Sequence, residues 1–406
     1  MKNNLFILII LACFSFACQQ TNPTSTTESA TAQTLEIPEL LDRHPDLRQG
    51  TEWDQIQRLY VSQQQALRKN PNNGEAFLNL AQIFINEARI TGEHGHYYPG
   101  ALTLTDNGLA TVELTDDLRF RLLSVKASVE LSQHDFEQAL QTAQAAVALN
   151  PYNAQIYGAL VDANVELGRY EEAVAMADKM VSIRPDLRSY SRVSYLREIY
   201  GDVEGAIEAL KLAVSAGFPG QEATCWARLT LGGLYETYGD TEAAKQQYEL
   251  ALAERQDYPF AIAKLANLKF AEGELEAAET DLLRAAAIIP EFSFYIDLAE
   301  LYAERGDEEK ATETLDEVLL MLEDDVKNGH QMDMEYAFLY LDTYGDAQEA
   351  LVYAKKEFER RPDNIDVNLL MAKIYDKLDD QAAVDRHLAV ANRTHSKHPD
   401  LLALAQ

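Results

Sequence analysis

Apolar side chains recur at helical spacing along most of this 406-residue chain. In residues 52–70 they return every three or four positions, which places them on one helix face; they are Trp53, Ile56, Leu59, Tyr60 and Leu67. Residues 382–392 show the same pattern near the other end. Long alternations of β-branched and polar residues are absent, and residues that favour helices dominate. The pattern predicts an all-α protein with a capping helix within residues 51–73 and a closing helix at 382–392.

A turn signature recurs inside this helical pattern. Each copy has a glycine, usually followed by Asp or Glu, and an alanine five positions after the glycine. The glycines are Gly168, Gly201, Gly239, Gly273, Gly306 and Gly345. Their successive spacings are 33, 38, 34, 33 and 39 residues, so the chain consists of repeated units. Weaker copies of the turn lie at His134-Asp135 and at Asp379-Asp380.

This period resembles that of tetratricopeptide repeats, about 34 residues, over residues 74–396. The resemblance implies an α-α superhelix, a solenoid of about nine antiparallel helical hairpins. Small residues at each crossing would let the two helices approach closely, and glycine would end the first helix with a positive φ. The residues expected at the crossings are Ala81, Ala127, Val161, Ser194, Gly232, Ala266, Ala299, Phe338 and Met371. Phe338 is large for such a position, so its hairpin is the one expected to pack differently.

Three stretches exceed the repeat length: residues 91–100, 216–221 and 323–330. Insertions in repeat arrays usually form loops on one face, which is often the binding face. We therefore expect these stretches to form loops. Residues 397–406, after the last unit, are expected to be a C-terminal tail.

The N-terminal residues predict export. The apolar run 5–17 follows Lys2 and is too short to cross a bilayer, as in a signal peptide spanning residues 1–17. The residues before Cys18 resemble the lipobox of bacterial lipoproteins, which implies a lipidated Cys18; Cys13 is the alternative, and a signal peptide without lipidation is another. Residues 18–50 would be the lipidated cysteine and a disordered tether. Because Gln19 and not Asp follows Cys18, lipoprotein sorting rules imply the outer membrane, facing the periplasm.

The chain is strongly acidic, with a net charge of −31. Such a surface repels phosphate backbones, so nucleic acid is not expected as a partner. Once Cys13 and Cys18 are assigned to the targeting segment, Cys225 has no disulfide partner. It is expected to be a small buried apolar residue.

No catalytic motif or cofactor-binding motif is present, so we expect neither an enzyme nor a cofactor. His94 and His96 form a His-x-His pair that could supply half of a metal site. The alternative is a loop held by packing of Tyr97 and Tyr98. No further ligand is indicated in the sequence, and no metal site is predicted.

The resemblance also implies where a partner would bind, because the first helices of tetratricopeptide arrays line a concave groove. The residues expected there are Arg121, Arg188, Tyr195, Trp226, Asn267, Phe270 and Tyr375. Arg, Tyr and Trp are typical interface anchors, although an aromatic residue at helical spacing belongs more often to the core than to a contact surface. No unit has the Lys–Asn pair with which related proteins grip chaperone C-termini.

The expected function is therefore that of a scaffold or adaptor in the cell envelope that binds a protein or peptide in its groove. The alternative is a receptor for a small molecule or glycan. A deep aromatic pocket around Trp226 would favour this alternative.

Overall fold

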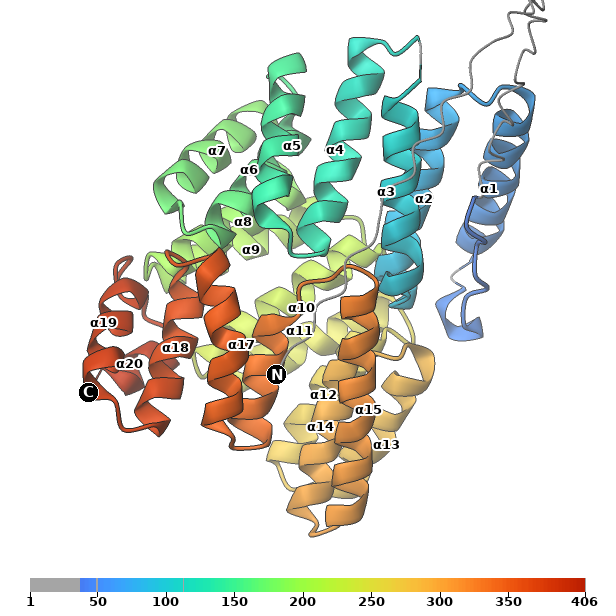
Figure 1. The fold of residues 1–406 in the computed structure, drawn as a ribbon. Helices are drawn as coiled ribbons and strands as arrows, with labels where there is room; N and C mark the ends of the chain where they lie inside the picture. The colour runs from blue at the N-terminus through green and yellow to red at the C-terminus, as the bar shows by residue number, and fades with distance from the viewer. Residues whose placement is uncertain (1–36, 49, 112, 406) are drawn as a thin grey trace, which may run out of the picture. The chain divides into compact units, whose positions relative to one another are not determined.

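The computed structural model describes residues 37–48, 50–111 and 113–405. The predicted signal peptide, Cys13, Cys18 and the tether up to residue 36 lie outside the described residues. From Ile37 onward the chain forms one compact unit (Figure 1). Its described residues contain helices and no strands, so the all-α prediction is confirmed.

The helices follow one another as antiparallel pairs. A short 3₁₀ helix, η1 (Pro45–Leu47), precedes α1 (Glu52–Lys69). The hairpins are α2 (Gly74–Thr91) with α3 (His94–Leu109), α4 (Asp116–Ser132) with α5 (Phe136–Leu149), α6 (Ala154–Glu166) with α7 (Tyr170–Ile183), α8 (Leu187–Ile199) with α9 (Val203–Ala216), α10 (Glu222–Thr237) with α11 (Thr241–Glu254), α12 (Pro259–Ala271) with α13 (Leu275–Ile288), α14 (Phe292–Glu304) with α15 (Glu308–Lys327), α16 (Asp333–Phe338) with α17 (Ala347–Arg360), and α18 (Ile365–Lys377) with α19 (Gln381–Ala391). The last helix is α20 (Pro399–Leu404). The predicted nine hairpins are thus present in the described part of the chain.

Each hairpin turns where the sequence signature lies. All six signature glycines adopt a positive φ, between 66° and 87°. At the two weaker turns His134 and Asp379 adopt the same conformation, with φ of 62° and 57°. The aspartate that follows most turns accepts a hydrogen bond from the first turn of the second helix and so caps it. These caps are Asp135, Asp202, Asp240, Asp307, Asp346 and Asp380.

Small side chains lie where the two helices of a hairpin cross. Ala127 and Ala266 are fully buried there. At Gly232 even a Cβ would collide with the ring of Tyr248, which is itself fully buried. The expected exception at Phe338 coincides with a change of helix type. There α16 ends, and a π-helix, η2 (Leu339–Thr343), completes the first helix of the hairpin.

For two of the three stretches the prediction of a loop is wrong, because most of their residues are helical. The extra residues 91–100 extend α2 and α3, and Tyr97 and Tyr98 are buried in the core between them. The extra residues 323–330 mostly extend α15 by more than a turn. The two extensions meet: the rings of His94 and His330 lie 6.1 Å apart. The added residues of α3 bury aromatic surface, whereas residues 323–327 of α15 are mostly exposed. Only the stretch 216–221 lies mostly between helices.

The segments at both ends of the array also pack more closely than expected. Residues 37–47 lie against the first hairpin, where the guanidinium of Arg43 binds the buried carboxylate of Glu87 at 2.6 Å. At the other end, where a tail was expected, α20 buries Leu401. The carboxylate of Asp400 pairs with Lys373 at 2.5 Å. Neither segment has a repeat signature, so only the tertiary contacts reveal the packing.

The last hairpin and the segment that follows it contact the turns of the third and fourth hairpins. The backbone N–H of Ile365, in α18, donates to the hydroxyl of Tyr170, in α7. The side chain of Asn364 donates to the carbonyl of Glu166 at 3.0 Å. A Cβ on Gly201 would lie 2.5 Å from the carbonyl oxygen of His395. We call this contact between residues 133–201 and residues 328–398 the closure.

Candidate binding groove

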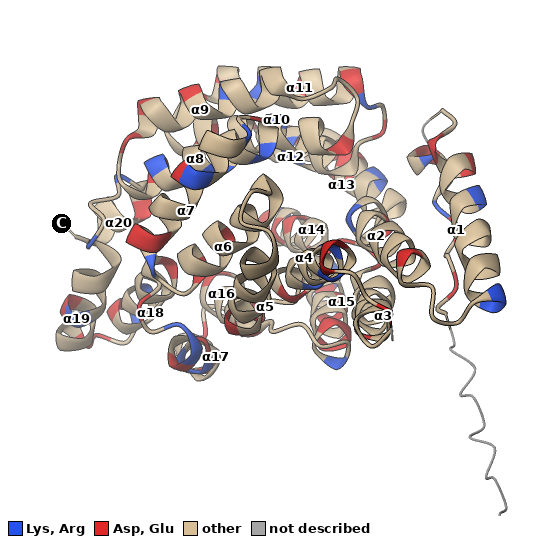
Figure 2. Ribbon diagram, turned by 90° about the horizontal axis from the view of Figure 1, so that it is seen from above, with Lys and Arg blue, Asp and Glu red and all other residues tan. Residues whose placement is uncertain are grey.

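The first helices of four successive hairpins line a cavity. In Figure 2, α9 and α11 lie toward the outside and α8, α10 and α12 toward the centre. The cavity has a volume of about 550 Å³ and is bounded by α8, α10, α12 and α14. We call it the aromatic cavity; its lining includes Ser191, Tyr195, Glu198, Trp226, Leu229, Phe260, Lys264, Asn267, Phe294 and Asp297.

Three aromatic rings form one wall of this cavity. The ring of Trp226 meets that of Phe260 edge-on at 5.5 Å, and Phe260 meets Phe294 at 5.6 Å. Trp226 nevertheless keeps 51% of its surface exposed, and Tyr195 keeps 40%. Phe294 is buried, so the wall is fixed from behind while its outer rings remain open to a ligand.

Polar groups stand beside the aromatic wall. The amide of Asn267 donates to Asp297 at 2.8 Å. Burial raises the pKa of Asp297 to about 6, and the charge of Glu300 adds to the effect. The pKa of Glu198 is raised for the same reason, first by burial and then by the charge of Asp366. These carboxyl groups lie in surroundings that favour a cation or a hydrogen-bond donor.

A second cavity of about 380 Å³ adjoins the first. We call it the closure cavity, because it lies between α8 and the last two hairpins. Tyr195 and Glu198 line both cavities. The hydroxyl of Tyr195 donates across the closure cavity to Asp366 at 3.5 Å. The side chain of Asp366 is accessible at the surface of the cavity. The surrounding hairpins nevertheless limit its hydration, and this partial desolvation raises its pKa.

The residues expected to bind a partner have different surroundings. Tyr195, Trp226 and Asn267 lie together in the aromatic cavity. Arg121 forms an exposed ion pair with Glu75 at 2.8 Å. The pKa of Arg188 is lowered by burial and then by the nearby charge of Arg89.

Two of the expected groove residues belong largely to the hairpin interior. Phe270 packs against the apolar cluster that contains Leu282 and Leu298. Tyr375 stacks on His387, with ring centres 5.6 Å apart. Both side chains hold hairpins together, and neither lines the two cavities.

Phe260, Phe294 and Asp297 line the aromatic cavity but were not among the expected residues. A signal for the two phenylalanines is present in the sequence. Trp226, Phe260 and Phe294 are each 34 residues apart, so they occupy one repeat position in three successive units. An aromatic residue at the repeat period builds a continuous wall because neighbouring hairpins stack in register.

His94 and His96 point to different surroundings. His94 stacks on Tyr98, with ring centres 5.2 Å apart, and burial lowers its pKa to about 4. The Nε2 atom of His96 lies 2.7 Å from the carbonyl oxygen of Glu39. In the described residues no group of three or more His, Cys, Asp or Glu side chains could hold a metal ion. Cys225 is fully buried, as expected for a small apolar residue.

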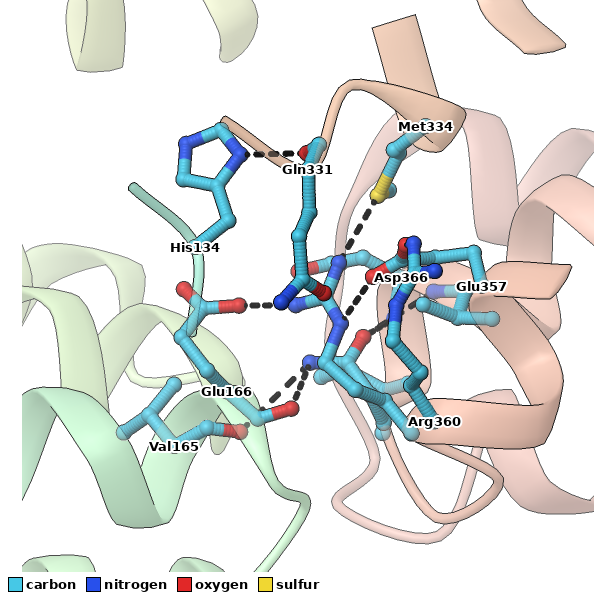
Figure 3. A network of polar contacts seen from close by, with 12 residues as sticks. His134, Val165, Glu166, Gln331, Met334, Glu357, Arg360 and Asp366 are labelled. Carbon is cyan, nitrogen blue, oxygen red and sulfur yellow. Dashed lines mark hydrogen bonds and ion pairs between the residues drawn. The ribbon is translucent and has the colours of Figure 1, made fainter. Parts of the chain in front are cut away.

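A polar network joins the two sides of the closure next to the cavities (Figure 3). At its centre Arg361 forms ion pairs with Glu166 and Glu357. Its guanidinium also lies 4.7 Å above the ring of Phe136. Burial raises the pKa of Glu166 to about 6 in spite of this arginine.

Within the described residues, none of the helices combines the length and the hydropathy that a membrane span requires.

A tetratricopeptide repeat family model matches residues 130–198. The small glutamine-rich tetratricopeptide repeat-containing protein 2 of Saccharomyces cerevisiae is 31% identical over 90 residues, which are 22% of this chain and 26% of the yeast protein. The chain thus matches about a quarter of the length of that relative.

Solved structures of repeat proteins are also similar. The Cut9–Hcn1 hetero-tetramer of APC/C aligns with a TM-score of 0.47 and 13% identity, over 88% of this chain and 60% of that one. A thermophilic tetratricopeptide protein of Thermus thermophilus aligns with a TM-score of 0.41 and 21% identity, over 48% of this chain and 98% of that one. Together with the nine hairpins and their turns, the family match shows that this chain has the tetratricopeptide-type helical-repeat fold, which generally mediates protein–protein interaction.

Proposed function

We propose that this protein is an envelope-anchored scaffold or adaptor that binds a protein partner in its concave groove. The aromatic cavity is the observation that carries the proposal. Tyr195, Trp226 and Asn267 come from three different hairpins and converge on it. The proposal includes no catalytic step, no cofactor and no nucleic acid as a partner.

The exposure of Trp226 supports a docking role. When a partner covers a half-exposed tryptophan in a concave surface, apolar area is removed from water, and this contributes favourable free energy to binding. Its ring is held by Phe260, so little side-chain freedom would be lost on binding. A rigid aromatic anchor surrounded by polar groups is the arrangement found at energetic centres of protein interfaces.

Anchoring to the envelope is proposed from the N-terminal sequence alone. Cys18 would carry the lipid, and the protein would face the periplasm from the outer membrane. Mass spectrometry of the mature N-terminus, with membrane fractionation of Cys18→Ala and Cys13→Ala variants, tests this. Lipid on Cys18 and release of only the Cys18→Ala variant are expected. An unmodified mature N-terminus would contradict the anchoring proposal.

The groove itself is tested by crosslinking in intact cell envelopes with the full-length protein as bait. Trp226→Ala removes the proposed anchor. Tyr152→Ala is the matched control, because Tyr152 is 80% exposed and lies in the turn before α6, outside both cavities. A partner captured by the wild type and the control but lost with Trp226→Ala supports the proposal. Equal capture by all three proteins would contradict it.

A receptor for a small molecule or glycan is the second candidate, and the size of the aromatic cavity favours it. A volume of about 550 Å³ falls within the range of small-molecule sites, roughly 300–1,000 Å³. Trp226 could stack on an apolar ring face while Asn267 and Asp297 bind hydroxyl groups. Titration of a panel of mono- and oligosaccharides against the purified protein, followed by isothermal titration calorimetry, tests this candidate. Saturable binding that Trp226→Ala abolishes would favour it over the scaffold.

A further inference from the structure

We infer that the aromatic cavity and the closure cavity form one site for an extended peptide segment that carries an apolar or aromatic side chain close to a lysine or arginine. The inference rests on the proposed function, because it specifies the partner of the same groove. Its basis is the way in which charge is distributed over the cavity lining.

Within the described residues, the side-chain hydrogen-bond donors to three carboxyl groups of the lining are all neutral. Asp297 accepts from Asn267 at 2.8 Å. Glu198 accepts from the hydroxyl of Tyr238, and Asp366 from that of Tyr195, each at 3.5 Å. No ion pair involving these three residues is found in the described part of the chain, where ion pairs are otherwise frequent.

The basic residues of the lining do not balance these charges. Lys373, in the closure cavity, is paired with Asp400 at 2.5 Å. That leaves Lys264 as the remaining lysine among the residues that line the two cavities. Three carboxyl groups against one amine give the combined cavity an excess of negative charge, which Arg361 and His398 offset only in part at Asp366. Complementarity therefore selects a cationic partner group.

The position of the charges sets the order of the partner's side chains. Tyr195 and Glu198 form the boundary that both cavities share. An apolar side chain placed against Trp226 in the aromatic cavity would leave a neighbouring lysine or arginine beside Glu198 and Asp366. The ring of Tyr195 can carry the apolar stem of that cation, and its face attracts the charge. The two anchors must lie close in the partner sequence, because the cavities adjoin.

The probes are four acetylated and amidated seven-residue peptides with an alanine background. One contains Phe and Lys two positions apart, and the others replace Lys by Gln, Lys by Glu, or Phe by Ala. The chain has two tryptophans, so a full-length Trp53→Phe variant leaves Trp226 as the reporter of binding. The Phe–Lys peptide is expected to bind at least about tenfold more tightly than the Phe–Gln peptide, as expected for a cation placed beside desolvated carboxylates. The Phe–Glu peptide should bind most weakly.

The charge variants are Glu198→Gln and Asp366→Asn, which keep the size of each side chain. Combined, they are expected to remove the preference for Lys over Gln and to leave the preference for Phe over Ala. Lys264→Gln is the matched control for a change of charge in the same lining, and should preserve or strengthen the preference for Lys.

Several results would overturn the inference, and they differ from failure of the proposed function. Equal affinity for the Lys and Gln peptides, or no binding of any peptide, would reject the cationic segment. The envelope crosslinking with Trp226→Ala would still test separately whether the protein is a scaffold that binds a partner in the groove. Competition by free lysine amide at the same concentration as the peptide would assign the site to a small amine and reject the peptide. Loss of binding in the Lys264→Gln control would also contradict the charge argument.

Discussion

The hydroxyl of Tyr170 accepts the backbone N–H of Ile365 at 2.8 Å, although the two residues are 195 positions apart. Tyr170 begins the second helix of the third hairpin, and Ile365 begins the first helix of the ninth. Both residues are buried. The bond lies at the centre of the closure, so the last hairpin depends on the third for part of its stability.

The Tyr170→Phe variant tests this bond. It leaves the buried N–H of Ile365 without an acceptor, which costs about 1–3 kcal/mol. Tyr152→Phe is the matched control, because its hydroxyl is on an 80% exposed side chain. We expect urea unfolding to show a loss of stability for Tyr170→Phe and almost none for the control. A similar stability of both variants would show that the bond contributes nothing to the closure.

A methyl group at Gly168 should open the closure. Gly168 has a φ of 72°, and a Cβ there would collide with the backbone carbonyl of Asp363. Gly273 has a φ of 83° with no atom within 4 Å of its Cβ position, so Gly273→Ala tests the backbone strain alone.

We expect Gly273→Ala to cost about 1 kcal/mol and Gly168→Ala clearly more. In hydrogen exchange, Gly168→Ala should lose protection around residues 363–395, and Gly273→Ala should not. Equal costs for the two variants, with protection at 363–395 retained, would mean that the closure tolerates the added methyl group.

Arg361 is expected to be the most sensitive charged residue of the closure. Arg361→Met removes the cation between Glu166 and the buried Glu357, which should cost about 2–4 kcal/mol. Arg121→Met, which breaks an exposed pair, should cost less than about 1 kcal/mol. The double variant Arg361→Met/Glu166→Gln should recover part of the loss, since it no longer leaves that carboxylate without its partner. Additive effects in this double-mutant cycle would contradict a direct interaction.

Acidification should weaken the contact between the two helix extensions through His94. Burial lowers the pKa of His94 to about 4, so between that value and its usual 6.5 the unfolded chain binds a proton that the folded protein does not. Stability is therefore lost as the pH falls through this window.

From pH 7.5 to 5.0 the wild type should lose about 1–2 kcal/mol more than the His94→Phe variant, which keeps an aromatic ring against Tyr98. Asp325, whose pKa burial raises to about 6, acts in the opposite direction in both proteins. Denaturation at the two pH values checks the difference. Parallel pH profiles would refute a buried neutral His94.

Part of the lining of the aromatic cavity followed from the repeat register, and part did not. Tyr195, Trp226 and Asn267 converge because neighbouring hairpins stack in register. Phe270 and Tyr375 were assigned by the same register, but Phe270 packs against the apolar cluster that contains Leu282, and Tyr375 stacks on His387. Register places a residue on the first helix, whereas the neighbouring side chains decide whether its ring is covered.

The sequence by itself determined the helices, the hairpin count and the turns. These depend on local physics: glycine accepts a positive φ, aspartate caps the next helix, and small residues allow a close crossing. Where glycine is missing, His134 and Asp379 adopt the same turn. A local pattern is therefore enough to predict them.

Only the tertiary structure decided the closure, the closure cavity and the contact between the two helix extensions. The pairing of Arg361 with Glu166 joins residues 195 positions apart and follows no repeat pattern. Such contacts depend on small rotations between hairpins that add up along the array. Each rotation is set by side-chain packing, so their sum cannot be obtained from the period and the anchor residues alone.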